Sequence, residues 1–506
     1  MSNPRTSVSN PPNVSIHDLD YDSLLSIFNL CRPDLFEKYE YGDILWVNWV
    51  HERWWYKLVK VCRRWRYLIL GSASHLGLCL VYSRGTPVAD MLAHSPPFPL
   101  IIFHDDNNHD LTPEDEGRIM FALEYRDRVR RIYLGMPVLG LQKIIKAMDD
   151  QFPMLEYLYI APTTMRNVHL VLPATFKAPQ LNHLMLDHFA SPIGSPLLAT
   201  AVSLVRLSLR WIHPSTNLYP DHLIQALSLL PQLQNLAVIF SSPVPKREIE
   251  RHILRMPSIT HTTLPNLRSF GFGGVNAYLE ALLSNMNAPH LESLRVSFFH
   301  QLSFSVPHLR QFLGATRSLN FYSVQVLFYH KAVAVFMYPS VRTTLPAFDI
   351  RVGCEHLDWQ VSSMAQIFND LSPLFSAVVD LIIDYRSHTL SSEWHNRPNR
   401  TQWRKLLGSF RNVETLRVHH DLVGELTCSL RSDGEPPLEI LPALKELVCP
   451  VGSRGDKTLV PFVHDRKVMG QPINLTEEDF PAGRFNYRFE TLAGVVYVSA
   501  DPDPLP

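Results

Sequence analysis

The sequence PQLNHLML, residues 179–186, contains a proline and then a six-residue unit, LNHLML, with apolar residues at its first, fourth and sixth positions. The same spacing occurs twelve times in all, in units that begin at residues 129, 155, 181, 204, 233, 267, 291, 319, 347, 378, 413 and 444. The average interval is about 29 residues, which is typical of repeat proteins. We therefore expect an array in which each copy is one structural unit.

The segments between the copies predict the second element of each unit. Residues 141–148, 222–230, 278–283 and 403–407 carry apolar residues at helical spacing, and a proline often precedes the next copy. Since proline cannot continue a helix, it indicates a helix that ends before a short strand begins. A doubly wound α/β sheet is the alternative, but its strands are continuous apolar runs, whereas these alternate. The expected fold class is α/β, with a curved leucine-rich-repeat-like αβ solenoid over residues 129–475.

Other segments have different compositions. Residues 459–475 resemble a closing half-repeat, and residues 476–506 are predicted to be a tail. Residues 81–128 are predicted to connect the array to an N-terminal module over residues 14–80, and residues 1–13 are predicted to be disordered. The module holds two amphipathic helical patterns, at residues 16–30 and 54–70, separated by an insertion at residues 32–53.

The two helical patterns carry a recognisable motif. The sequence LDYDSLLSIF (residues 19–28), followed by VCRRWRYL (residues 61–68), resembles the F-box motif. The run after it, which includes GSASHLGLCL (residues 71–80), looks like a large group of fungal F-box proteins whose F-box precedes leucine-rich-like repeats. Two features depart from the motif: Asp20 stands where proline is usual, and the insertion is longer than typical.

The resemblance implies a role in protein ubiquitination. F-box proteins dock on a Skp-type adaptor, which bridges to the cullin of an SCF-type ubiquitin ligase, so this chain would be a non-catalytic substrate-recognition subunit in the cytoplasm, the nucleus or both. Residues at motif positions are the candidates for adaptor contact or support: Leu19, Leu24, Leu25, Ile27, Phe28, Val61, Cys62 and Trp65. Each of them also fits a plain core role. The alternative is a solenoid scaffold with a vestigial F-box.

The array would then be the receptor for a protein substrate. In each six-residue strand, the third and fifth positions point away from the apolar set. They are rich in residue types favoured at protein interfaces, and arginines there suit carboxylates or phosphates of a partner. The candidates for the substrate-binding face are Arg131, Tyr133, Tyr157, Tyr159, His183, Arg206, Arg295, Arg351 and Arg417.

Composition argues against several other classes. The net charge is −1, with 47 basic and 48 acidic residues, which disfavours a nucleic-acid or membrane partner. The sequence has no apolar run long enough for a membrane span, no signal-peptide pattern and no clustered cysteines. It contains no phosphate-loop, zinc-protease or nucleophile-elbow motif, so we expect no catalysis, no cofactor and no metal. An enzyme with an unrecognised site is a distant third hypothesis.

Overall fold

The computed structural model describes residues 16–32, 52–105, 111–163, 170–190, 193, 195–213, 218–241, 261–299, 301, 303–316, 319–329, 331–340, 345–354, 356–386, 400–430, 440–451, 459–478, 487–492 and 495–500. The predicted disordered segment 1–13 and nearly all of the predicted insertion 32–53 lie outside these residues.

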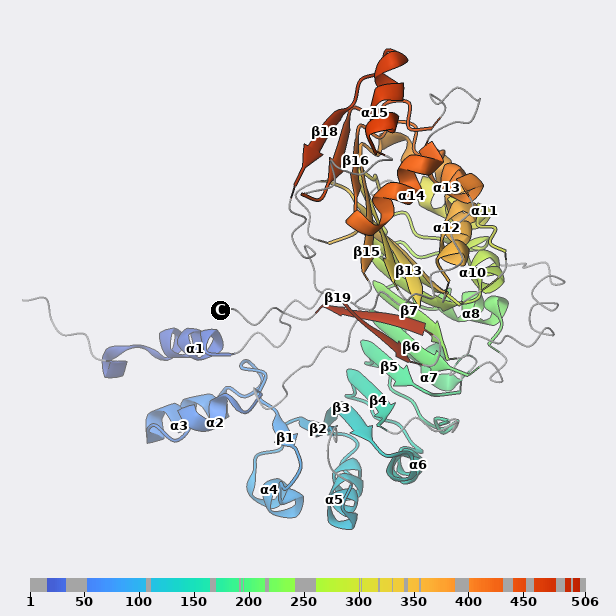
Figure 1. The fold of residues 1–506 in the computed structure, drawn as a ribbon. Helices are drawn as coiled ribbons and strands as arrows, with labels where there is room; N and C mark the ends of the chain where they lie inside the picture. The colour runs from blue at the N-terminus through green and yellow to red at the C-terminus, as the bar shows by residue number, and fades with distance from the viewer. Residues whose placement is uncertain are drawn as a thin grey trace, which may run out of the picture.

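Sixteen of the described strands form one sheet, which runs the length of the molecule (Figure 1). In its N-terminal part, neighbouring strands are parallel and follow chain order. These strands are β1 (Leu80–Tyr82), β2 (Leu100–Asp105), β3 (Val129–Met136), β4 (Tyr157–Pro162), β5 (His183–Asp187), β6 (Arg206–Ile212), β7 (Asn235–Phe240), β9 (Ser269–Gly274) and β11 (Ser293–Phe298). A separate small pair joins β8 (Thr262–Thr263) to β10 (Met286–Asn287).

The helices cover one side of this sheet (Figure 1). They are α4 (Val88–His94), α5 (Pro113–Leu123), α6 (Val138–Ala147), α7 (Pro196–Thr200), α8 (Pro220–Leu227), α10 (Asn276–Leu283), α11 (Pro307–Ala315), α12 (Leu357–Leu371), α13 (Arg400–Leu407), α14 (His420–Leu430) and α15 (Leu459–Val468), with a 3-10 helix, η4 (Ser372–Ala377), after α12. The apolar positions of the repeated unit, such as Leu181, Leu184 and Leu186, are buried between sheet and helices. The array is therefore a leucine-rich-repeat-like αβ solenoid.

The regular order is interrupted once in the described sheet. Strands β12 (Ser323–Tyr329), β13 (Ala332–Tyr338) and β14 (Phe348–Gly353) form an antiparallel meander, and β14, not β12, lies next to β11. The expected unit at residue 319 was therefore misplaced, because the strand begins at Ser323. The parallel order resumes with β15 (Asp380–Arg386), β16 (Thr415–Val418), β17 (Glu446–Cys449) and β18 (Asn474–Glu477).

The structure also corrects both ends of the array. Strands β1 and β2 pair with each other and with β3, so residues 81–128 belong to the solenoid and do not merely connect to it. The sheet continues to Glu477 in β18. The predicted tail contains a hairpin of β19 (Tyr487–Leu492) and β20 (Val495–Ala500), and β20 lies near β11 and β14.

The N-terminal module consists of a 3-10 turn, η1 (Ile16–Asp18), and helices α1 (Tyr21–Leu30), α2 (Trp55–Leu58) and α3 (Arg63–Gly71). Asp20 is the N-cap of α1, since its carboxylate accepts a hydrogen bond from the Ser23 amide at 2.7 Å. The single helix expected over residues 54–70 is broken. Cys62 has extended backbone and starts α3 as its N-cap, so the helical pattern belongs to two helices.

Candidate interaction surfaces

Two of the residues predicted to contact the adaptor belong to the core of the N-terminal module. Leu24 and Phe28 in α1 are fully buried. The Phe28 ring meets the Trp65 ring of α3 edge to face, with centroids 4.9 Å apart. This contact holds α1 against α3, so Leu24 and Phe28 act as core residues of the module.

The remaining members of that set differ in exposure. Ile27 is 37% exposed and Val61 is 59% exposed, which leaves both apolar side chains available at the surface of the module. Four others are half-buried, and they are Leu19, Leu25, Cys62 and Trp65. The Cys62 thiol accepts the Trp65 amide at 3.5 Å, so its local role is to cap α3.

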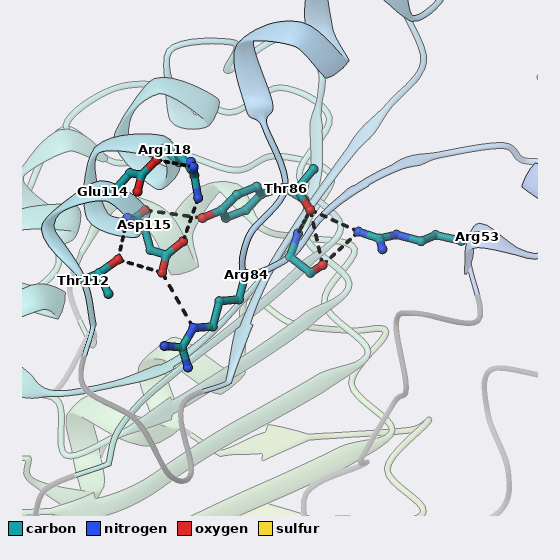
Figure 2. Close-up of polar contacts among 9 residues, drawn as sticks. Arg53, Arg84, Thr86, Thr112, Glu114, Asp115 and Arg118 are labelled. Atoms are coloured by element: carbon teal, nitrogen blue, oxygen red, sulfur yellow. Dashed lines mark hydrogen bonds and ion pairs between the residues drawn. The ribbon is translucent and has the colours of Figure 1, made fainter.

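Polar contacts fasten the module to the first repeats. The Arg53 guanidinium donates to the Val81 carbonyl at 3.0 Å and to the Ser83 hydroxyl at 2.8 Å, and it also reaches Thr86 (Figure 2). The Trp55 indole donates to the Cys79 carbonyl at 3.3 Å. The module is therefore joined to the array at the edge strand β1.

A second group of polar contacts, next to those of Arg53, fixes the first turn of α5. Asp115 is buried and accepts hydrogen bonds from the Thr112 hydroxyl at 2.8 Å and from Arg118 at 3.3 Å, and Arg84 lies 3.8 Å away (Figure 2). Burial by itself would raise the pKa of the Asp115 carboxyl. The hydrogen bonds from Thr112 and from the Gly85 backbone, together with the positive charge of Arg118, have the larger effect, so the pKa of Asp115 lies below its ordinary value. Asp115 is thus a stabilised anion.

The predicted substrate-binding residues lie on the face of the sheet opposite the helices, here called the inner face. Parallel register places one row of third-position residues across four adjacent strands: Arg131, Tyr157, His183 and Arg206. We call this row the Arg131–Arg206 row. Neighbouring strands are about 4.8 Å apart, so the row spans about 14 Å between its end residues.

The next row along the same strands is aromatic and closely packed. Tyr133 stacks on Tyr159 with centroids 4.4 Å apart, and Phe103 lies 5.1 Å from Tyr133. We expected this face to be exposed, but Tyr133, Tyr157 and Tyr159 are buried in a separate apolar cluster. Burial raises the pKa of all three hydroxyls well above the usual range. They form a packed floor, because rings on adjacent strands cover one another.

Most of the predicted arginines already have carboxylate partners within the chain. Arg295 and Arg351 share Asp349, at 3.0 and 3.4 Å. Arg417 pairs with Asp380 at 3.3 Å and with Glu478 at 2.8 Å. These three arginines are therefore not free to meet a partner's carboxylate without breaking an internal pair.

Arg131 is also paired, and its partner comes from outside the array. Its guanidinium donates to the Glu52 carboxylate at 2.6 Å, and Glu52 is only 1% exposed. Glu52 stands at the end of the insertion, and nothing in its local sequence marked it as an inner-face residue. Asp349, by contrast, occupies a third position of the repeated unit, so the strand pattern was sufficient to find it.

Arg206 differs from the other arginines on this face. It is half-buried, and burial lowers the pKa of its guanidinium. Within the described residues, its favourable electrostatic neighbour is the Tyr157 hydroxyl, and no carboxylate contributes. Burial, with the charges of Arg206 and Arg131, lowers the pKa of His183 to about 4. His183 is therefore neutral at pH 7, and Arg206 carries the charge at its end of the row.

Neither a metal-binding cluster nor a membrane-spanning helix occurs among the described residues. No group of three or more His, Cys, Asp or Glu side chains there is arranged to hold a metal ion. None of the described helices meets the length and hydropathy needed to cross a membrane. The described cysteines that are not in a disulfide bond are Cys31, Cys62, Cys79, Cys354 and Cys449.

No protein-family model and no curated protein matches the chain. Among solved structures, the chain is similar to the leucine-rich repeat-containing protein LegL7 from Legionella pneumophila, at 12% sequence identity and a TM-score of 0.23. The match covers 78% of this chain and 99% of that chain. The repeat architecture rests on the strand order and register described above, and the likeness of the N-terminal module to the F-box stays a prediction.

Proposed function

We propose that this chain is a non-catalytic substrate-recognition subunit of an SCF-type ubiquitin ligase. Its N-terminal module would dock on a Skp-type adaptor, and the solenoid would bind a protein substrate. Holding the substrate near the ubiquitin-charged enzyme raises its effective concentration, which is the whole contribution required of such a subunit. The chemistry would belong to other subunits, in the cytoplasm, the nucleus or both.

The observation that carries the proposal is the division of roles within the module. Leu24 and Phe28 fill its core, whereas Ile27, which directly precedes Phe28 in α1, and Val61, just before α3, remain exposed. Apolar side chains left at the surface gain free energy when a partner removes them from water. Both residues occupy positions that match the F-box motif, so they are the strongest candidates for adaptor contact.

The solenoid supports the receptor half of the proposal. Its inner face carries arginine, tyrosine and histidine in register over adjacent strands, and these residue types are enriched at interfaces. Because the module is joined to β1 by Arg53 and Trp55, a substrate held on the first repeats would be close to the adaptor.

Adaptor binding is the direct test. The purified full chain is passed over an immobilised Skp-type adaptor, beside a variant carrying Ile27→Asp and Val61→Asp. We expect the double variant to lose at least about tenfold in affinity, because buried charges at an apolar interface are costly. Val468→Asp is the matched control, since Val468 is an exposed apolar residue of α15, at the opposite end of the array from the module.

Two outcomes would contradict the proposal. If the wild-type chain does not bind the adaptor, the ligase role is wrong, and the scaffold alternative with a vestigial F-box takes its place. If the double variant binds as tightly as the wild type, the adaptor contact lies elsewhere and Ile27 and Val61 have no part in it. Leu24 and Phe28 are unsuitable for this test, because replacing either would disrupt the core of the module.

A further inference from the structure

The Arg131–Arg206 row has arginines at both ends, and only one of them has a carboxylate partner among the described residues. At the Arg131 end, Glu52 approaches from outside the sheet and pairs at 2.6 Å. At the Arg206 end, the residues in register on either side are His183 and Asn235, and Tyr157 lies beyond His183; none of the three carries negative charge at neutral pH. The other four arginines predicted for this face are paired with carboxylates of the chain, and Arg206 is the exception among the five; the four are Arg131, Arg295, Arg351 and Arg417.

An uncompensated guanidinium that is half-buried lacks both full hydration and a counter-charge. Such a group gains free energy when an anion approaches, because the anion supplies the charge-assisted hydrogen bonds that the protein leaves open. The buried pair of Glu52 with Arg131 shows how an anionic side chain enters this row: a carboxylate from another segment lies over the inner face and meets a row arginine.

We propose that the Arg131–Arg206 row binds an acidic segment of a partner protein, with Arg206 receiving its carboxylate or phosphate group and Glu52 occupying the second anion position in the free chain. The inference rests on the proposed function, in which the solenoid is the substrate receptor, and it assigns the substrate class. Glu52 then acts as an internal competitor for Arg131.

The geometry limits the ligand. Two anionic groups that reach both arginines must be about 14 Å apart, and an extended peptide rises about 3.3 Å per residue. Anionic residues about four positions apart therefore match the row. Tyr133, Tyr159 and Met185 lie beside the row on the same strands, and their buried side chains give the row an apolar border.

The test uses the full chain and synthetic probes. A fluorescein-labelled peptide of glycine and serine residues, with two glutamates four positions apart, is titrated with protein and followed by fluorescence anisotropy. A second probe carries phosphoserine in place of each glutamate, and a third carries glutamine. We expect both anionic probes to bind and the glutamine probe to bind at least about tenfold more weakly. Competition by inorganic phosphate distinguishes a site that prefers phosphate from one that accepts carboxylate equally.

Substitutions make the site assignment specific. Arg206→Gln should weaken binding of the anionic probes at least about tenfold, while Glu52→Gln should strengthen it, because the side chain that contacts Arg131 loses its negative charge and no longer repels an anionic probe. Arg268→Gln is the control, since Arg268 is an exposed arginine that pairs with Glu292 away from the row. Thermal unfolding of each variant verifies folding, and Arg206→Lys keeps the charge if Arg206→Gln is unstable.

The proposal is overturned if Arg206→Gln binds like the wild type, if Glu52→Gln gives no gain, or if the glutamine probe binds as tightly as the anionic ones. Its failure is separable from failure of the ligase role. Peptide binding needs no adaptor, and Arg206→Gln should leave adaptor binding unchanged because Arg206 lies in β6, outside the N-terminal module.

Discussion

Glu280 offers a test of how neighbouring repeats hold one another. It lies in α10, and its two carboxylate oxygens accept the backbone amides of His308 at 2.7 Å and Leu309 at 3.0 Å. These amides are at the start of α11, where they have no partner within the helix. One repeat thus caps the helix of the next. Glu280 is 9% exposed, and burial raises its pKa to about 7 in spite of both hydrogen bonds.

The sign of the pH effect follows from this shift. The pKa of Glu280 in the folded chain is about 7, above the reference value of 4.5, so the folded state holds the proton more tightly than the unfolded state. Stability from this group is fully present below pH 4.5 and is lost as the pH rises through 7. One pKa unit corresponds to about 1.4 kcal/mol, so between pH 5 and 8 the expected loss is about 2 kcal/mol.

Hydrogen exchange of the α11 amides measures this loss locally, which suits a repeat array because its units open separately. The change is Glu280→Gln, which keeps an acceptor oxygen and cannot ionise. After correction for intrinsic exchange rates, the opening free energy of α11 in the wild type should fall by about 2 kcal/mol relative to the variant between pH 5 and 8.

The control for this experiment is Glu292→Gln, which removes an exposed carboxylate from the same part of the chain. It should leave the pH profile of α11 unchanged. Parallel profiles for the wild type and Glu280→Gln would refute the reasoning, because they would mean that Glu280 has the same proton affinity in the folded and unfolded chain. A pH effect spread equally over all helices would refute it as well.

Two further predictions concern the N-terminal part. Phe28→Ala should destabilise the module by about 3–5 kcal/mol, because the ring is fully buried against Trp65, whereas Ile27→Ala should cost well under half of that. Hydrogen-exchange protection of the amides in α1 and α3 measures both losses. Equal losses would contradict the assignment of Phe28 to the core. The pKa of Asp115 is lowered in the folded chain, so its contribution to stability is present above the ordinary pKa near 4 and is lost as the pH falls through the lower folded pKa. Asp115→Asn should therefore lower stability at pH 7 and make the region around α5 less sensitive to acid. An unchanged melting temperature at pH 7 would contradict this.

The repeated units were predictable because their signal is local. Apolar residues at the first, fourth and sixth positions, with helical spacing between copies, encode which side chains face the core irrespective of distant contacts. The same logic failed at Ala332–Tyr338, where every residue of β13 is buried. A strand that is apolar on both faces has no alternation to detect, and its place between β12 and β14 depends on antiparallel pairing that the period does not encode.

The sequence predicted which face of the sheet the candidate site residues lie on, but not whether their side chains are buried or paired. Alternation along a strand was enough to place Arg131 and Tyr157 on the inner face, but only the structure showed that they lie side by side in register. It was not enough to show that Tyr157 is buried, because packing of rings on adjacent strands depends on how the strands align. For the same reason the roles of Phe28 and Ile27 separated only when α1 was seen against α3.

By itself, the sequence determined the identity of the repeating unit, the side of each strand that faces the helices, and the presence of amphipathic helical segments ahead of the array, because each depends on residues within a few positions of one another. Only the tertiary structure decided which arginines are already neutralised. Glu52 and Arg131 are 79 positions apart, and their pairing depends on how the end of the insertion folds back over the sheet. No local pattern records such a contact, since it exists only once the array has formed beneath it.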